Sequence, residues 1–180
     1  MAVRRTNGTN NDDMFVAAFG ANDKFIGKAG NDFANGMDGN DILKGGKGSD
    51  ILIGYTGNDK LYGDAGSDFL FGGTDRDLLW GGKGTDYFLF YVDSTFGQGS
   101  DIDIIKDFKA KGAEKDMIAF VAGPASSEDI TSYDDIVDRM SQKGKDVHIT
   151  FDTGDTLIIE NTKIKDLSAG NFAFQYEVDF

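Results

Sequence analysis

The chain has 180 residues and a formal net charge of −13, with 27 Asp, 4 Glu, 25 Gly, one His and no Cys. Without cysteine there are no disulfides or thiolate sites, and the acidic balance argues against nucleic acid, whose phosphates are bound mainly by Lys and Arg. The length suits one domain or slightly more, and no apolar run approaches the ~18 residues that a membrane span requires.

The N-terminal lead-in, residues 1–17, lacks the apolar core of a cleaved signal peptide. Asp12, Asp13, Met14 and Phe15 are interpreted as one degenerate unit of the repeat that follows, out of phase with it by one residue.

Residues 18–89 consist of eight units of nine residues. Each unit has an aspartate at its sixth position and an apolar residue, or Ala34, at its eighth. Self-similarity at such a short, strict period indicates a solenoid. The aspartates are Asp23, Asp32, Asp41, Asp50, Asp59, Asp68, Asp77 and Asp86.

Each unit divides into a turn and a strand. Six residues rich in Gly, Asn and Asp form the turn, and three residues centred on the eighth position form a short strand. Two turns and two strands close one coil, and coils stack at the ~4.8 Å spacing of neighbouring strands. We therefore predict an all-β fold, a right-handed parallel β-roll of two short-stranded sheets, with the eighth-position side chains as its core.

The same geometry stacks the aspartates in two files. The first file is Asp23, Asp41, Asp59 and Asp77, and the second file is Asp32, Asp50, Asp68 and Asp86. Two carboxylates ~5 Å apart repel by about 3 kcal/mol at an effective dielectric of about 20. Six such pairs would outweigh the ~5–15 kcal/mol stability of an ordinary domain, so cations must lie between them.

The chemistry of the turns selects the cation. They offer only carboxylate and carbonyl oxygens, which suit Ca²⁺ better than Mg²⁺ or zinc. We predict about six Ca²⁺ ions, one for each stacked pair, since Ca²⁺ accepts such oxygen-only sites. Bound calcium would bring the net charge close to zero.

These units resemble the RTX (repeats-in-toxin) calcium-binding nonapeptide repeat of bacterial secreted proteins. Three units, beginning at Gly45, Gly72 and Gly81, follow its pattern G-G-x-[G/D]-x-D-x-[L/F]-x. The resemblance implies six ligands for each ion. The Gly27 and Ala29 carbonyls with Asp32 would face the Gly46 and Gly48 carbonyls with Asp50.

The same offsets imply further ligands. Gly36, Asp38 and Asp41 would face Tyr55, Gly57 and Asp59. The other carbonyl ligands implied in this way are those of Gly45, Lys47, Gly54, Thr56, Asp64, Gly66, Gly73, Asp75, Gly82 and Gly84. The first unit departs from the pattern, with Ala21 in place of glycine.

The outward faces of the two sheets differ in character. One sheet is nearly all apolar outside, and soluble proteins rarely expose such a patch, so we expect the C-terminal half, a second copy or an upstream domain to cover it. These residues are Phe33, Ile51, Ile53, Phe69, Phe71, Tyr87 and Leu89. The other sheet carries Lys24, Lys44 and Lys60, which indicate either solvated strand charges or a groove for an anionic polysaccharide.

Residues 90–180 have a more conventional composition. Short strands are predicted at 103–108 and 116–120, a hairpin from 147–151 and 156–159, and a final alternating strand at 172–180. Ser126 to Asp129 indicate a helix start. The apolar stripe of that helix ends near Gly144 and consists of Ile130, Tyr133, Ile136, Val137 and Met140.

This half is similar to the segment that follows the repeats in serralysin-like secreted proteins. The similarity lies in residues 103–108, 154–157 and 166–172 and in the terminal pair Asp179 and Phe180. It implies a segment that caps the roll and carries an uncleaved signal for the type I secretion machinery. An open solenoid end needs such a cap on physical grounds alone.

The sequence contains no recognisable catalytic set. His148, the one histidine, alternates with Val147 and Ile149 and is predicted to face solvent on a strand. We expect a secreted, extracellular, non-catalytic calcium-binding module that folds on binding Ca²⁺. The alternatives are the export and polysaccharide-binding module of a larger secreted enzyme, such as a protease, lipase or alginate-modifying enzyme, and a self-assembling surface or adhesion protein.

Overall fold

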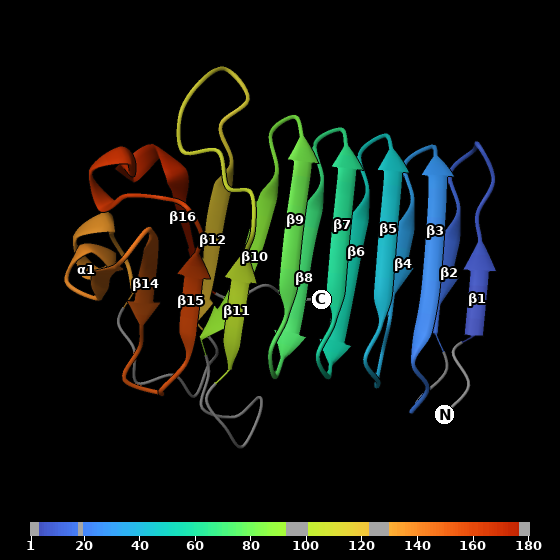
Figure 1. Cartoon of the computed structure of the whole chain (residues 1–180), viewed down its shortest axis with the longest axis horizontal. Helices are drawn as coiled ribbons and strands as arrows, with labels where there is room; N and C mark the ends of the chain where they lie inside the picture. Colours follow the sequence, from blue (N-terminus) through green and yellow to red (C-terminus); the bar gives the residue numbers. More distant parts are fainter. Residues whose placement is uncertain (1–3, 18–19, 93–100, 123–129, 177–180) are drawn as a thin grey trace.

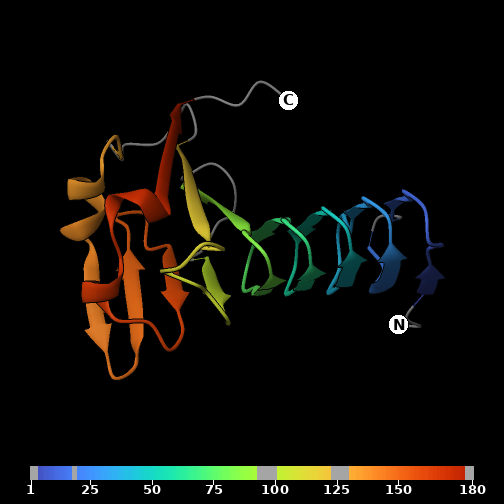
Figure 2. The ribbon, with the colours of Figure 1, turned by 90° about the horizontal axis from the view of Figure 1, so that it is seen from above.

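The computed structural model describes residues 4–17, 20–92, 101–122 and 130–176 (Figure 1). It is all-β, with two sheets whose strands lie side by side along the long axis of the molecule. Seen from above, successive coils zigzag from the N-terminal end toward a broader C-terminal block (Figure 2). The fold is therefore a β-roll, as the repeat predicts.

The repeat units supply alternate strands to the two sheets. One sheet receives β3 (Asp23–Ala29), β5 (Ile42–Lys47), β7 (Lys60–Ala65) and β9 (Leu78–Lys83). The other receives β4 (Phe33–Asn35), β6 (Ile51–Thr56), β8 (Phe69–Thr74) and β10 (Tyr87–Val92). All these strands pair in parallel with partners 18 residues apart, as in Leu43 with Leu61, so the predicted period of one coil is confirmed.

The eighth-position side chains form the core of the roll. Each is at most 1% exposed, because the strand alternates and turns its central side chain inward between the two sheets. They are Phe25, Ala34, Leu43, Leu52, Leu61, Leu70, Leu79 and Phe88.

The lead-in adds one more coil before the repeats. Strands β1 (Arg4–Asn7) and β2 (Met14–Val16) pair in parallel with β3 and β4. Met14 pairs with Phe33, 19 residues away, so this coil is one residue longer than the 18-residue coils that follow. Phe15 stacks on Phe25 at 5.1 Å between ring centroids and closes the core at this end.

The C-terminal half extends both sheets. Strands β11 (Ile102–Ile105) and β12 (Met117–Ala122) continue the roll in parallel, followed by β15 (Thr156–Ile159) and β16 (Phe172–Tyr176). Strands β13 (Met140–Lys143) and β14 (Asp146–Thr150) are antiparallel and form the outer edge of the larger sheet. Strand β10 runs across residues 89 and 90, so repeats and C-terminal half share continuous sheets.

The predicted helix is wrong in its extent. The observed α1 spans Tyr133–Val137, because Ser132 and Asp135 form a capping box that fixes its start. Ile130 precedes the helix, Met140 belongs to β13, and residues 126–129 lie outside the described part of the chain. Two 3₁₀ turns, η1 (Ile164–Asp166) and η2 (Ala169–Asn171), lead into β16.

The remaining C-terminal strands are found, with one difference in extent. The strand predicted at 103–108 is β11, which ends at Ile105, so its predicted continuation through Phe108 is wrong. The strand predicted at 116–120 is β12, and the hairpin is the antiparallel pair β14 and β15. The final strand is β16, and its predicted continuation at 177–180 lies outside the described residues. In the described part of the chain, no helix is long and apolar enough to cross a membrane.

Candidate metal centre

The repeat aspartates form two continuous files, as the coil period predicts. The backbone N–H of each aspartate donates to Oδ1 of the aspartate one coil later, at 2.6–3.1 Å. All eight side chains are at most 2% exposed. The turns therefore bring their carboxylates into the interior at the two edges of the roll.

The second oxygen of nearly every carboxylate lacks a partner. Oδ2 is buried and accepts no hydrogen bond in Asp32, Asp41, Asp50, Asp59, Asp68, Asp77 and Asp86. A buried anionic oxygen without a partner is costly, so each of these atoms points to a cation that belongs beside it. Asp23 differs, because Nε and one terminal nitrogen of Arg4 donate to its two oxygens, each at 3.1 Å.

Burial also shifts the titration of these groups. Loss of hydration raises the pKa of the carboxyl groups to about 6 at Asp41 and Asp50, about 7 at Asp68 and Asp77, and about 9 at Asp59. The backbone N–H donors lower the pKa values in part, and neighbouring carboxylates raise them further. At neutral pH the calcium-free files therefore oppose full ionisation.

We call the space between the turns of two stacked units a layer. Carbonyl groups of the turns line each layer. Carbonyls at positions 2 and 4 of a unit face the following coil, as the Gly30 oxygen lies against Gly48. Carbonyls at positions 1 and 3 face the preceding coil: the Gly45 oxygen lies against Gly27, and the Lys47 oxygen accepts from the Gly30 N–H at 2.9 Å. Each layer thus receives carbonyl oxygens from both of its coils.

This alternation corrects the implied pairing of ligands. The carbonyls of Gly27 and Ala29 were expected to meet those of Gly46 and Gly48, but the Gly48 oxygen lies against Gly66, in the next layer. The layer between Asp32 and Asp50 is lined instead by Lys28 and Gly30 from one coil and by Gly45 and Lys47 from the other.

The reason for the alternation is the backbone conformation of the turns. Positions 2 and 4 are left-handed, with φ of 87° at Lys28 and 112° at Gly30, so successive peptide groups point in opposite directions. Position 2 accepts this conformation even at Tyr55, where φ is 86°.

The structure places most of the other proposed carbonyl ligands by the same rule. Those shown facing the following coil are Tyr55, Asp64, Gly66, Asp75, Gly82 and Gly84. Those shown facing the preceding coil are Gly54 and Thr56. The sequence pattern did not indicate several further carbonyls that line these layers, namely those of Lys28, Gly30, Met37, Gly39, Ala65, Gly72, Thr74, Gly81 and Lys83.

Position 1 must lack a side chain. A Cβ on Gly45 would collide with the Asp50 carboxylate, and a Cβ on Gly54 would collide with the Asp59 carboxylate. The bare glycine therefore creates the room in which each carboxylate and its neighbouring carbonyls converge.

The donor set fits a hard cation. Within the described ranges, no three acidic or histidine side chains converge as a metal-binding group, so carbonyl oxygens must complete any coordination sphere. Two carboxylates and four carbonyls of one layer provide the oxygen-only environment that Ca²⁺ accepts. The residues present therefore fit calcium.

Both files extend beyond the eight aspartates. The N–H of Asp77 donates to Asp103 Oδ1 at 3.2 Å, and that of Asp86 donates to Asp116 Oδ1 at 3.1 Å. At the other end, the N–H of Asp13 donates to Asp32 Oδ1 at 2.8 Å. Asp103 and Asp116 each precede an isoleucine by two positions, so the repeat's Asp-x-apolar pattern was a usable signal that irregular spacing concealed.

The apolar outer face is only partly shielded. Phe33, Ile51, Phe69 and Tyr87 pair in register across β4, β6, β8 and β10, and Ile51 and Tyr87 remain 43% and 41% exposed. Leu89 is buried, and the other residues of this face, Phe33, Ile53, Phe69 and Phe71, are half-buried. The described C-terminal strands continue the sheets at the end of the roll, so the proposed occupants of this face stay untested.

Replacing a shared carboxylate should damage two layers. Asp59 borders the layers with Asp41 and Asp77, so Asp59→Ala should lower the calcium stoichiometry by about two ions in equilibrium dialysis. The control is Asp64→Asn, which changes an exposed side chain at φ of 73°, a conformation that asparagine tolerates. Equal stoichiometry in the two variants would contradict the assignment of the files.

The raised pKa values predict how the calcium-free chain responds to pH. Protonated carboxyls favour the folded roll fully below about pH 4, and this contribution is lost as pH rises through the folded pKa values of about 6 to about 9. In EGTA, strand content measured by circular dichroism should therefore increase from pH 8 to pH 5. Asp59→Asn should flatten the response, whereas a loss of strand content on acidification would overturn the prediction.

Comparison with known proteins agrees with this geometry. The family model of the RTX calcium-binding nonapeptide repeat (4 copies) matches residues 17–52 and again 53–88. No curated protein gives a significant match to the chain.

Two solved structures resemble the chain over most of its length. The extracellular lipase LipA of Serratia marcescens is 17% identical with a TM-score of 0.43, over 95% of this chain and 40% of the lipase chain. The AlgE6R3 subunit of the mannuronan C5-epimerase of Azotobacter vinelandii is 21% identical with a TM-score of 0.36, over 92% of this chain and 80% of that subunit. The chain thus spans well under half the length of the lipase. Residues 17–88 are thus an array of RTX calcium-binding nonapeptide repeats.

Proposed function

We propose that the chain is a secreted, non-catalytic calcium-binding module whose repeats fold when they bind Ca²⁺ outside the cell. The observation that carries this proposal is the set of seven buried carboxylate oxygens without hydrogen-bond partners. They lie in two files, and each faces a layer that carbonyl oxygens also line.

The residues of the turns would hold the ions in six layers. Between Asp50 and Asp68, for example, the ligands would be the carbonyls of Gly46 and Gly48 from one coil and those of Gly63 and Ala65 from the next. The layer between Asp23 and Asp41 differs, since Ala21 supplies a carbonyl there and its neighbour at position 2 lies outside the described residues. Bound calcium supplies the positive charge that permits stacked carboxylates to remain ionised in the interior.

The conformation of the turns shapes the layers. Glycine at position 1 leaves room for the carboxylate, and left-handed residues at positions 2 and 4 aim the carbonyls into the layers. Without a cation, repulsion between carboxylates and the chain entropy of glycine oppose folding. Calcium binding energy therefore becomes folding energy.

The calcium requirement favours an extracellular location. Extracellular sites of this kind typically bind at about 10⁻⁴–10⁻³ M, which extracellular calcium fills. Export through the type I secretion machinery, unfolded and without cleavage of a leader, agrees with a chain that folds only after it meets calcium.

The histidine does not lead toward catalysis. His148 is half-buried on β14, opposite Ser141 and Ile158 in the neighbouring strands. Burial lowers the pKa of its imidazole, and the repeat accounts for the core aspartates as ligands.

Removal of calcium tests the proposal. In EGTA at pH 8 the chain should lose its strand signal in far-ultraviolet circular dichroism, and millimolar Ca²⁺ should restore it because only then are the layers filled. Millimolar Mg²⁺ serves as the matched control and should restore little, since Mg²⁺ demands a tighter octahedral site. Unchanged strand content in EGTA would rule the proposal out.

A second candidate function is assembly, with a second copy or with an upstream domain of a larger secreted enzyme. The observation that favours it is the row of half-buried and exposed apolar side chains along β4, β6, β8 and β10. A face of this kind is commonly an interaction site.

Light scattering in millimolar Ca²⁺ tests assembly between copies. The wild-type chain should exceed the mass of a monomer, and Ile51→Lys should restore the monomer because it places a charge in the apolar row. Ile42→Lys, the same substitution at the same unit position on the opposite sheet, should leave the mass unchanged. A monomeric wild-type chain would remove self-assembly and leave the upstream domain as the occupant to seek.

A further inference from the structure

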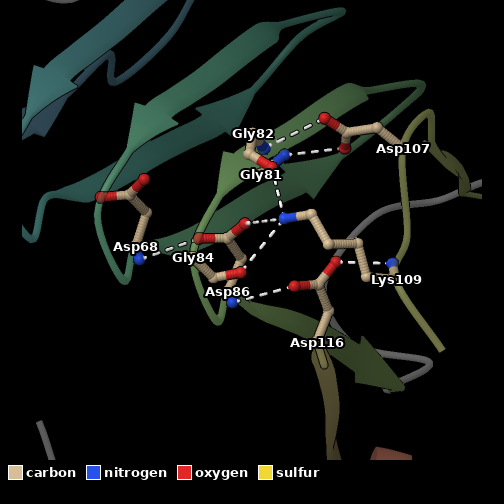
Figure 3. Close-up of polar contacts among 8 residues, drawn as sticks. All are labelled: Asp68, Gly81, Gly82, Gly84, Asp86, Asp107, Lys109 and Asp116. Atoms are coloured by element: carbon tan, nitrogen blue, oxygen red, sulfur yellow. Dashed lines mark hydrogen bonds and ion pairs between the residues drawn. The ribbon is translucent and has the colours of Figure 1, made fainter. Parts of the chain in front are cut away.

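A lysine side chain reaches the end of the second file. Lys109 lies in the segment between β11 and β12, and its ammonium group donates to the carbonyl oxygens of Gly82 and of Gly84, the latter at 3.1 Å (Figure 3). The same nitrogen is 3.9 Å from Oδ2 of Asp86, a carboxylate that is fully buried. Three oxygens of the last repeat thus converge on one cationic side chain.

These three oxygens are the set that earlier coils present to the following layer. Gly82, Gly84 and Asp86 occupy positions 2, 4 and 6 of their unit, as Gly46, Gly48 and Asp50 do two coils earlier. We call this set the half-site of a coil. In the earlier coil the half-site faces another repeat, whereas here it faces Lys109.

The next coil holds Lys109 in place through Asp116. Oδ2 of Asp116 accepts the Lys109 N–H at 2.7 Å, and the Asp116 N–H donates to the Lys109 carbonyl at 2.8 Å. Oδ1 of Asp116 accepts the Asp86 N–H at 3.1 Å, which continues the file by one member. The lysine backbone is therefore fixed to the same carboxylate that stacks above Asp86.

A second acidic residue, Asp107, fixes the turn of the last repeat. The carboxylate of Asp107 accepts the N–H groups of Gly81 and Gly82 at 2.9 and 3.0 Å (Figure 3). This leaves the Gly82 carbonyl free to point toward the lysine. Beside the strand pairs β10–β12 and β9–β11, charged side chains that bind turn backbone therefore join the last repeat to the C-terminal half.

The opposite end of the other file is closed in the same way. Arg4 stands at the register position of an aspartate, paired with Asp23, and its guanidinium contacts both oxygens of that carboxylate. Among the repeat aspartates, Asp23 is the one whose second oxygen is not left without a hydrogen bond. A side-chain cation therefore lies beside the first repeat aspartate of one file and beside the last repeat aspartate of the other, at opposite ends of the repeat array.

We propose that Lys109 is a built-in cation that takes the place of calcium in the layer between Asp86 and Asp116. The inference rests on the proposed function, because it assumes that calcium fills the layers before this one. The ammonium supplies positive charge to the last half-site, so this layer binds no ion and the C-terminal half stays joined to the roll independently of that layer's calcium.

Counting ions in a matched pair of variants tests the proposal. In Lys109→Gln the half-site is released and gains an amide oxygen, so equilibrium dialysis at saturating Ca²⁺ should give one more ion than in the wild-type chain. Lys60→Gln removes the same charge from an exposed side chain on the outer face of β7, away from the layers, and should leave the count unchanged. An unchanged count in a Lys109→Gln chain that keeps its strand signal would overturn the proposal.

Chemical labelling of the wild-type chain gives a second test that requires no variant to fold. In saturating Ca²⁺, acetylation of Lys109 should be about tenfold slower than that of Lys83, because its hydrogen bonds to two carbonyl oxygens must first break. Equal rates would show that Lys109 has left the half-site, and would overturn the proposal. A wild-type chain that binds no calcium at all would instead refute the proposed function.

Discussion

Seven of the eight repeat aspartates commit one carboxylate oxygen to a backbone N–H of the coil before them and leave the other oxygen buried in a layer without a partner. That arrangement is unstable by itself, since burial disfavours the charged form and each carboxylate adjoins another. The rest of the structure depends on how the negative charge of these carboxylates is compensated. Glycines open the layers, left-handed residues turn carbonyls into them, and the dry core between the sheets holds the files at a fixed spacing.

The regular part of this fold could be predicted from the sequence because a strict period leaves little freedom. Aspartates nine residues apart, each followed by an apolar residue, require an 18-residue coil, and the observed register has that period at Leu43 and Leu61. The same spacing placed all eight buried aspartates. It could not give the direction of individual carbonyls, since Lys28 and Gly30 face a layer only through their positive φ angles, which the residue types at position 2 do not reveal.

The positions of ligands and strands were harder to predict beyond the last regular repeat. Asp103 and Asp116 continue the files, but they follow the last repeat aspartates of their files by 26 and 30 residues, and the loops between them hide the pattern. Lys109 gives no local signal, because its role depends on Asp116 holding its backbone across from Asp86. The helix was predicted to be longer than it is, because the apolar stripe continues beyond Val137 into β13, to which Met140 belongs.

Because backbone N–H donors link the aspartates along each file, neighbouring layers share an aspartate. An aspartate such as Asp50 borders two layers, so an ion that orders it in one layer also prepares the next, as in a one-dimensional array of coupled sites. The two files lie on opposite edges and share ligands only within themselves. Calcium binding should then proceed from layer to layer along each edge. Arg4 lies at the beginning of the row of layers on one edge, and Lys109 lies at the end of the row on the other.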